Sequence, residues 1–390
     1  MTSKLIQDIR EKFVQLFDVI PVVVAAPGRI NLIGGHTDYN EGFVLPGAIN
    51  KGIVTAVQKS NLSDCNVFAI NKNESYSFNL NDIQPIKHGD WRNFILGVVA
   101  EIQKRGIKLP SFNMVFGGDI PDGSGLSSSA ALENSIAFAL NEAFQLNIPK
   151  IELIKISQMA EHNFVGVKCG IMDQYASMFG IKNHVLMLDC RSLEAVPIQL
   201  SLQGYRLVLI NSNVKHNLAE AAYNERRSVC ESIARKLGVK VLRDVNKSDL
   251  AEIQSQVQPN DYLKALHIVN EIERVELAVT AVKNNDIKTF GGYMFDSHHG
   301  ASTLYDISCD ELDFMVNEAK NFEGVIGARM MGGGFGGCSI NIVAEQVVEP
   351  FIKHIDEAYY DRFKIHATIE CIDLSDGACV ISNEKSYHDR

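Results

Sequence analysis

The chain reads Pro-Gly-Arg-Ile-Asn-Leu-Ile-Gly-Gly-His-Thr-Asp-Tyr-Asn over residues 27–40. This stretch combines a guanidinium, an imidazole and a carboxylate with glycines that let the backbone approach a bound molecule closely. Together these groups can donate and accept hydrogen bonds to several hydroxyls at once, which is what a small polyol requires. The plainer interpretation is a polar loop after the apolar strand predicted at residues 22–26. Two further glycine-rich clusters downstream favour a binding site.

Size and charge limit the classes of protein to consider. With 390 residues the chain is too long for one compact core, so we expect two domains, residues 1–180 and 181–390. A formal net charge of -10 argues against a nucleic-acid partner. Such an acidic protein would bind an anion such as ATP only locally, through backbone amides, a metal ion and a few cations. No obligate protein partner is indicated.

Cysteine usage and the N-terminus indicate the compartment. The eight cysteines are scattered without a Cys-x-x-Cys pair, which favours a reduced, cytoplasmic protein and argues against a zinc site. Near the N-terminus, apolar residues between Leu5 and Phe17 recur at helical spacing among charges, so we expect an amphipathic surface helix rather than a signal peptide. No apolar run approaches the length of a membrane span.

Hydrophobic patterning predicts a mixture of helices and strands, with α/β character in the first half and α+β character in the second. Strands are expected at residues 22–26, 53–58, 66–70, 112–116, 184–188, 206–210, 337–343 and 365–372. Helices are expected at residues 129–146, 151–167, 261–283 and 310–319.

The second cluster reads Ile-Pro-Asp-Gly-Ser-Gly-Leu-Ser-Ser-Ser-Ala-Ala over residues 120–131. Glycines here expose backbone N–H groups, and the predicted helix that follows points its positive end at the same place. The serines add hydroxyl donors, so the segment is suited to holding phosphate. It is not a Walker loop, because no Gly-Lys-Ser/Thr ends it. The alternative is a helix cap formed by Ser127, Ser128 or Ser129.

Two acids near residue 170 complete a possible phosphoryl-transfer site. Asp173 follows a glycine in an apolar segment and could accept a proton from a sugar hydroxyl. Glu161, twelve residues upstream, could ligate Mg²⁺. Taken singly, an acid of this kind is more often a capping or solvated carboxylate, so the weight of each comes from the neighbouring clusters.

The third cluster covers residues 329–337, with five glycines in six positions before an apolar strand. That exceeds what a hairpin needs and predicts backbone packed against a ligand or another loop. Residues 211–216 and 223–227 add polar groups on a loop and a following helix. For Arg226 and Arg227 we favour a solvated helix face.

With these clusters in this order, the chain resembles the galactokinases of the GHMP small-molecule kinase superfamily, essentially from end to end. Residues 28–34 and 36–40 are similar to the galactokinase signature, and residues 123–131 to the superfamily's phosphate loop. Residues 169–174 are similar to the segment of the catalytic base, residues 211–227 to the sugar-side helix, and residues 329–338 to the third motif.

The resemblance implies an α+β, two-domain GHMP kinase fold: an N-terminal α/β domain with a mixed sheet, a C-terminal α+β domain, and an active site in the cleft between them. It also implies transfer of the γ-phosphoryl group of ATP to the C1 hydroxyl of α-D-galactose, with Mg²⁺ as cofactor. Asp173 would then be the base, and Arg29 would stabilise the developing charge.

The remaining site residues follow from the same resemblance. Sugar binding would involve the signature positions Gly35, His36, Thr37 and Asp38, with Gly170 and Tyr223. Ser129 and Glu161 would hold Mg²⁺, and Trp91 would flank the adenine. The triphosphate would lie on Gly123, Ser124, Gly125, Leu126, Ser127, Ser128 and Ser129.

One position departs from the family pattern. The signature usually reads Gly-Glu-His-Thr-Asp, but here Gly35 replaces the glutamate that the family uses near the C6 hydroxyl of the sugar. Losing one such acceptor costs about 1–3 kcal/mol if nothing replaces it. Three interpretations stay open: weaker galactose binding with water in the gap, a pocket opened for a C6-altered sugar, or an altered sequence. A related sugar 1-kinase for a C6- or C2-modified hexose, or a non-catalytic sensor of galactose and ATP, are the competing functions.

Overall fold

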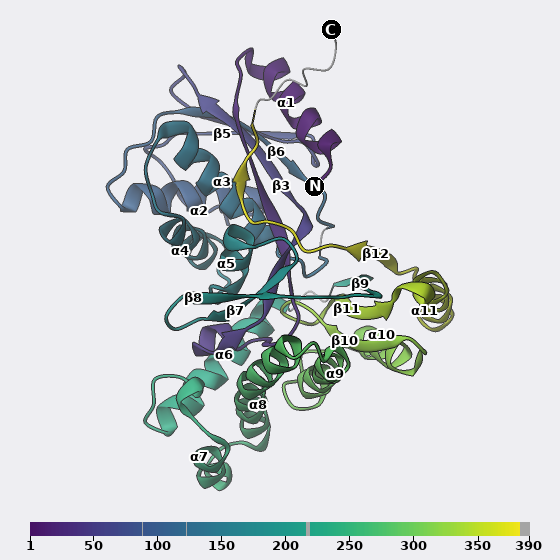
Figure 1. Cartoon of the computed structure of the whole chain (residues 1–390). Helices are drawn as coiled ribbons and strands as arrows, with labels where there is room; N and C mark the ends of the chain where they lie inside the picture. The colour runs from purple at the N-terminus through teal and green to yellow at the C-terminus, as the bar shows by residue number, and fades with distance from the viewer. Residues whose placement is uncertain (88, 122, 216–218, 383–390) are drawn as a thin grey trace.

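The computed structural model describes residues 1–87, 89–121, 123–215 and 219–382 (Figure 1). Within these ranges the chain forms three sheets with helices packed against them, so the predicted mixture of α and β structure is confirmed. None of the helices in these ranges combines the length and apolar character needed to cross a bilayer. Asp122 of the predicted phosphate loop and His216 of the polar loop lie outside the described residues.

A six-stranded sheet carries the N-terminal part, in the order β13-β1-β3-β6-β4-β5. The pairing of β4 with β6 is parallel, whereas the other neighbours are antiparallel, so the sheet is mixed. The strands are β1 (Val22–Asn31), β3 (Pro46–Lys59), β4 (Cys65–Ala69), β5 (Glu74–Phe78), β6 (Phe112–Gly118) and β13 (Cys379–Val380).

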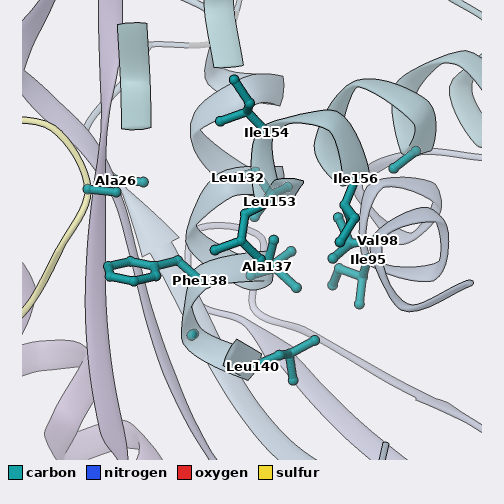
Figure 2. Close-up of a cluster of buried hydrophobic side chains, with 14 of the residues drawn as sticks. Ala26, Ile95, Val98, Leu132, Ala137, Phe138, Leu140, Leu153, Ile154 and Ile156 are labelled. Carbon is teal, nitrogen blue, oxygen red and sulfur yellow. The ribbon is translucent and has the colours of Figure 1, made fainter. Parts of the chain in front are cut away.

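Helices cover both faces of this sheet, which explains why residues 22–26 are apolar without alternation. On one face α1 (Ser3–Phe17) packs Ile9 and Phe13 against Val23 and Ala25. On the other face Val24 and Ala26 join the core formed with four helices, part of which Figure 2 shows. These helices are α2 (Trp91–Lys104), α3 (Ser128–Phe144), α4 (Lys150–Ala160) and α5 (Met172–Phe179).

A four-stranded antiparallel sheet forms the C-terminal part, in the order β10-β11-β9-β12. Alternate residues of β9 point to opposite faces of this sheet, and each face is covered by its own pair of helices. Val208 and Ile210 pack against α10 and α11, whereas Leu207 and Leu209 join residues of α8 and α9. The elements are β9 (Tyr205–Lys215), β10 (Val325–Met330), β11 (Gly336–Ala344), β12 (Thr368–Ile372), α8 (Pro259–Lys283), α9 (Ile287–Thr303), α10 (Asp310–Asn321) and α11 (Val348–Phe363).

The two parts share a continuous core. Ile30 and Leu32, at the end of β1 and just beyond it, pack with Leu209 and Val275 of the C-terminal part. The end of the chain returns to the first sheet, where Val380 of β13 pairs with Val24. The division near residue 180 stays a prediction. The remaining elements are a three-stranded sheet of β2 (Phe43–Val44), β7 (His184–Asp189) and β8 (Glu194–Gln199), with helices α6 (Ala219–Lys236) and α7 (Lys247–Glu252).

Every predicted helix and strand overlaps an observed one, but β3 begins seven residues earlier than expected and β1 and β9 end five residues later. Two further differences have clear reasons. The helix expected at residues 151–167 is α-helical only to Ala160 and then continues as a π-helical turn, Glu161–Val165. Such turns are rare and often mark functional positions. The strand expected to start at residue 365 starts at Thr368, because α11 runs to Phe363 and Lys364 closes it with φ 58°.

Helix α9 lies so close to β10 that the contact admits no side chain. A Cβ on Gly291 would lie 2.0 Å from the carbonyl oxygen of Ile326, whereas one on Gly292 would meet nothing within 4 Å. We therefore expect Gly291→Ala to lower the free energy of unfolding by about 1–3 kcal/mol through overpacking. The control Gly292→Ala should be neutral or stabilising by up to about 1 kcal/mol, because alanine favours the helix.

Urea unfolding followed by circular dichroism measures both changes. Equal effects of the two substitutions would contradict this account of the helix–strand contact.

Candidate active site

An ion pair joins the buried Arg29 of β1 to the partly exposed Asp173 in the first turn of α5. Arg29 Nε donates to Oδ1 at 2.7 Å, and Nη2 donates to Oδ2 at 2.6 Å. The third nitrogen, Nη1, donates to the carbonyl oxygen of Gly125 at 2.6 Å. A bidentate guanidinium fixes both the position and the plane of its carboxylate. The predicted base and the predicted charge stabiliser are therefore in direct contact, and both are tied to the glycine-serine loop.

The glycine-serine loop turns sharply into helix α3. Gly123 and Gly125 have φ of 72° and 69°, which favours glycine, and Ser127 is also left-handed with φ 58°. Ser127 occupies the N-cap position of α3, but its side chain does not cap the helix. Its hydroxyl instead donates to Oδ2 of Asp173. The capping interpretation is therefore wrong for Ser127, and its hydroxyl faces the predicted base.

Other groups of this loop are available for a ligand. The buried hydroxyl of Ser124 has no hydrogen-bond partner among the described residues. Ser128 and Ser129 lie in the first turn of α3, where backbone N–H groups have no partner within the helix. Backbone amides at a helix N-terminus favour an anion.

The third glycine cluster packs directly on this loop. A Cβ on Gly332 would lie 3.1 Å from Cα of Gly125, and one on Gly337 would lie 3.2 Å from the carbonyl oxygen of Gly123. A Cβ on Gly125 would in turn lie 3.1 Å from the carbonyl oxygen of Met331. The prediction that these glycines pack against another loop is confirmed.

Buried acids lie behind Asp173. The pKa of Glu161 is raised to about 7, first by burial and then by the charge of Asp173, whereas hydrogen bonds from Cys169 and Ser129 oppose the shift. The structure thus brings Ser129 and Glu161, the two predicted Mg²⁺ ligands, together. Gln174 Nε2 donates to Glu161 Oε2 at 3.1 Å.

Sequence reasoning missed a third acid, Glu133. Burial raises its pKa well above the ordinary value, and Glu161 adds to the shift. Its Oε1 has no hydrogen-bond partner among the described residues. Glu133 follows Ser129 by four residues in α3 and therefore shares its helix face, which is the signal that could have revealed it.

These oxygen donors fit a magnesium ion. Among the described residues, no three acidic, histidine or cysteine side chains form a metal site by themselves. Mg²⁺ usually takes only one or two carboxylates and completes its shell with phosphate oxygens and water. The hydroxyl of Ser129 and the carboxylate of Glu161, beside the unpaired Oε1 of Glu133, match that pattern.

Asp38 lies against Gly170, and only glycine fits there. A Cβ on Gly170 would lie 2.0 Å from Oδ2 of Asp38. Burial raises the pKa of Asp38 to about 6, and the nearby charge of Asp173 adds to the shift. The two predicted sugar-binding positions thus meet beside the predicted base. The hydroxyl of Thr37, by contrast, donates to the carbonyl oxygens of Gly34 and Phe43, at 3.0 and 2.6 Å.

His36 is held by a chain of hydroxyls. Its pKa falls to about 3 because of burial, so the imidazole is neutral. Nε2 lies 3.2 Å from the carbonyl oxygen of Gly333, which can only accept, so Nε2 carries the proton. Nδ1 must then accept from Tyr39, 2.8 Å away, and the Tyr39 hydroxyl in turn accepts from Tyr305 at 2.7 Å.

Tyr223 reaches the same group, whereas Trp91 does not. The Tyr223 ring lies 4.9 Å from that of His36, centroid to centroid. The Trp91 ring contacts Tyr76 and Phe116, and its Nε1 donates to Glu74 at 3.2 Å. None of these Trp91 contacts involves the glycine-serine loop.

The solvated-face interpretation is wrong for Arg226. This side chain is buried, and its Nε and Nη2 donate to the carbonyl oxygens of Tyr305 and Asp306, at 2.8 and 2.6 Å. It therefore anchors helix α6 to the segment after α9. Arg227 is partly exposed and donates to the carbonyl oxygen of Lys168 at 2.8 Å.

Comparisons with known proteins agree with this geometry. Family models match for the galactokinase galactose-binding signature over residues 11–59, the GHMP kinases N terminal domain over residues 93–181, and the GHMP kinases C terminal over residues 278–361. The chain is 42% identical to a galactokinase of Thermotoga neapolitana, over 91% of this chain and 98% of that protein. It is 44% identical to a galactokinase of Thermosipho africanus, over 92% and 99%.

Solved structures show the same fold. The Lactococcus lactis galactokinase, crystallised in complex with galactose, superposes with a TM-score of 0.92 at 30% identity, over 96% of this chain and 99% of that one. The Methanococcus jannaschii mevalonate kinase superposes with a TM-score of 0.68 at 18% identity, over 91% and 99%, which shows a shared fold alone. The predicted two-domain GHMP kinase fold is confirmed.

The hydroxyl chain predicts different effects for its two tyrosines. Tyr39→Phe removes the donor to Nδ1 of His36, so we expect a loss of about 1–2 kcal/mol of stability and a changed nitrogen-15 shift of Nδ1. The proton should stay on Nε2, because the carbonyl oxygen of Gly333 still accepts from it. Tyr305→Phe removes a similarly buried hydroxyl one link further away and should leave the Nδ1 shift nearly unchanged. Nitrogen-15 NMR of labelled histidine measures both, and a proton on Nδ1 in either variant would contradict the assignment.

Because the pKa of Asp38 is raised, replacing its carboxylate by a neutral group should stabilise the folded protein, and the gain should depend on pH. The folded protein holds the Asp38 proton up to about pH 6, whereas the unfolded chain releases it near 3.8. The destabilising charge is therefore absent below pH 3.8 and fully present above pH 6. We expect Asp38→Asn to gain about 2–3 kcal/mol at pH 7 and little at pH 4. Denaturant unfolding at both pH values measures this, and the exposed Asp82→Asn is the control, with no gain expected.

Proposed function

Because the chain belongs to the galactokinase family and is therefore a kinase, we propose that it transfers the γ-phosphoryl group of ATP to the C1 hydroxyl of α-D-galactose. The products are galactose 1-phosphate and ADP. The observation that carries the proposal is the contact of Arg29 and Asp173 with the glycine-serine loop, because it unites a base, a cation and a phosphate-binding loop at one point.

The chemical step requires positioning and charge neutralisation more than covalent help. The anomeric oxygen attacks the γ-phosphorus, a new oxygen–phosphorus bond forms, and the bond between that phosphorus and the β–γ bridging oxygen breaks. ADP leaves with the bonding pair, and the hydroxyl proton passes to the Asp173 carboxylate. Arg29 orients that carboxylate through two hydrogen bonds and neutralises charge that develops beside it.

Residues 123–129 would bind the nucleotide. Their backbone amides and the hydroxyls of Ser124 and Ser128 would hold the phosphates, at the positive end of α3. Ser129 and Glu161 would hold Mg²⁺, with Glu133 behind them. When bound, the ion neutralises phosphate charge and orients the γ-phosphoryl group. Trp91 is proposed to flank the adenine.

Sugar recognition uses the groups around Asp38. Its carboxylate and the backbone of Gly170 would bind sugar hydroxyls, with the rings of His36 and Tyr223 beside them. Because the Nε2–H of His36 donates to the carbonyl oxygen of Gly333, His36 would line the sugar site by packing. Gly35 and Thr37 belong to the same segment, Thr37 by shaping its backbone.

The cytoplasm is the proposed location. All eight cysteines lie within the described residues and are free thiols. Free thiols are typical of proteins from reducing compartments.

The proposal is tested with an ATP/Mg²⁺-dependent coupled assay against galactose, galactosamine, N-acetylgalactosamine, glucose and fucose. We expect galactose to have the highest kcat/KM of these five sugars. Asp173→Asn should lower kcat by about 10²–10⁴-fold, because the proton acceptor is lost. Nucleotide binding by calorimetry serves as the control for folding, since the substitution also leaves Arg29 without its charged partner. Full activity in Asp173→Asn would refute the assignment of the base.

A further inference from the structure

A buried acid of the C-terminal part holds the backbone of the galactokinase signature. Oε1 of Glu271, in α8, accepts from the backbone N–H of Gly34 at 2.9 Å and from that of Gly35 at 3.4 Å. It also accepts from the hydroxyl of Ser297 in α9. Glu271 is fully buried. Two successive amides of the signature therefore meet a single oxygen of a helix that is distant in sequence.

The held segment has a backbone conformation that needs support. Gly34 has φ 94°, and a Cβ there would lie 2.8 Å from the carbonyl oxygen of Phe43 and 2.9 Å from Cγ2 of Val275. His36, two residues further on, is also left-handed with φ 62°, which is uncommon for a residue with a side chain. Such a conformation persists only where the surrounding structure holds it in place. The contact with Glu271 lies directly before this position.

The same segment carries two of the groups proposed to surround the sugar. His36 follows Gly35 directly, and its ring lies beside that of Tyr223. Asp38 comes two residues after His36, and its carboxylate lies against Gly170. Because the connection is this short, a displaced backbone at Gly35 would move both the ring of His36 and the carboxylate of Asp38.

The two carboxylate oxygens of Glu271 have different partners. Oε2 forms an ion pair with the guanidinium of Arg274, whereas Oε1 receives the amides, and Nη1 of Arg329 lies 3.7 Å from Oε1. Burial alone would raise the pKa of Glu271, but the charges of Arg274 and Arg329 lower it to about 2. An ionised carboxylate can only accept hydrogen bonds, which suits two amide donors. Oε2 thus pairs with charge, and Oε1 faces the signature.

The plainer role for Glu271 is to neutralise two guanidinium groups. Arg329 is 2% exposed, and its Nη2 fills the space beside Gly35, 2.7 Å from where a Cβ would be. An unpaired charge at this depth is strongly unfavourable. Neutralising charge requires only that a carboxylate stay near the arginines, whereas holding the signature requires an oxygen within hydrogen-bond distance of the Gly34 N–H. The two roles therefore differ in their dependence on charge and on side-chain length.

We propose that Glu271 is a positioning residue for the sugar, which acts by holding the N–H groups of Gly34 and Gly35. The held backbone in turn places the carboxylate of Asp38 and the ring of His36. This rests on the proposed function, because that function is what makes Asp38 a sugar ligand. Glu271 acts only through the backbone of the signature and takes no part in the chemical step, so its loss should affect sugar binding before it affects the nucleotide.

Two substitutions separate side-chain length from charge. Glu271→Asp keeps the negative charge but withdraws it by one methylene group, so the contact with the Gly34 N–H is lost. Glu271→Gln keeps the length, and its amide oxygen can still accept from Gly34, but the charge opposite Arg274 and Arg329 is gone. Calorimetry without nucleotide measures galactose binding, and thermal unfolding measures stability. The control is Glu276→Asp at an exposed position of the same helix, for which we expect no change in either measurement.

We expect Glu271→Asp to weaken galactose binding at least about tenfold, and Glu271→Gln no more than about threefold. The KM for ATP should stay within about twofold of the wild-type value in both, because the partners of Glu271 lie outside the glycine-serine loop. The thermal midpoint should fall more in Glu271→Gln, which leaves the arginines without their carboxylate. Sugar affinity and stability thus rank the two variants in opposite order.

The positioning role is wrong if sugar affinity simply follows stability, with the same order of variants in both measurements. Wild-type galactose affinity in a folded Glu271→Asp protein also rules it out, and this comparison needs no result from Glu271→Gln.

Nitrogen-15 NMR of labelled histidine separates this proposal from the proposed function. In the sugar-free protein, Glu271→Asp should change the Nε2 shift of His36, because the contact with the carbonyl oxygen of Gly333 moves with the backbone. Glu271→Gln should leave that shift nearly unchanged. A wild-type protein that binds no galactose refutes the proposed function, and the His36 shifts still test whether Glu271 positions the segment. An Nε2 shift that Glu271→Asp leaves unchanged overturns the positioning role and leaves the galactokinase assignment intact.

Discussion

The partly buried ion pair between Arg29 and Asp173 is the interaction on which the rest of the site depends. It joins the end of β1 to the start of α5, and the third nitrogen of Arg29 carries the connection to Gly125 in the glycine-serine loop. Ser127 closes the same junction from the other side through its hydroxyl. A single guanidinium thereby aligns the predicted base with the phosphate-binding backbone. Positioning of this kind is the main requirement of phosphoryl transfer.

The close approach of two glycine-rich loops is the second constraint. Gly332 and Gly337 lie against Gly125 and Gly123 at distances that leave no room for a side chain. Within the described part of the chain the hydroxyl of Ser124 has no hydrogen-bond partner, and the first N–H groups of α3 have none within the helix. Such groups at a helix N-terminus could engage the phosphates of a nucleotide.

Burying acidic groups at the site lowers the stability of the fold but keeps these groups available to a ligand. The pKa values of Asp38 and Glu161 rise to about 6 and about 7, chiefly through burial, and burial also raises the pKa of Glu133. Neutralising these carboxylates, by a divalent ion or by hydrogen bonds from hydroxyls, is therefore favourable.

Local signals in the sequence determined the mixture of α and β structure, most strands and helices, the three glycine-rich clusters, and Asp173 and Glu161 as candidate base and Mg²⁺ ligand. Periodicity and turn chemistry are properties of neighbouring residues, so they can be read without the fold. The order of the motifs implied the kinase fold and the roles of Arg29 and Ser129 through a family resemblance. Only the tertiary structure decided that Ser127 turns to Asp173 rather than capping α3, that Arg226 is buried, that Gly333 and Tyr39 hold the two ring nitrogens of His36, and that Glu133 joins the acids. The physical reason is that the partner of a buried polar or charged group comes from segments distant in sequence, and packing alone selects that partner.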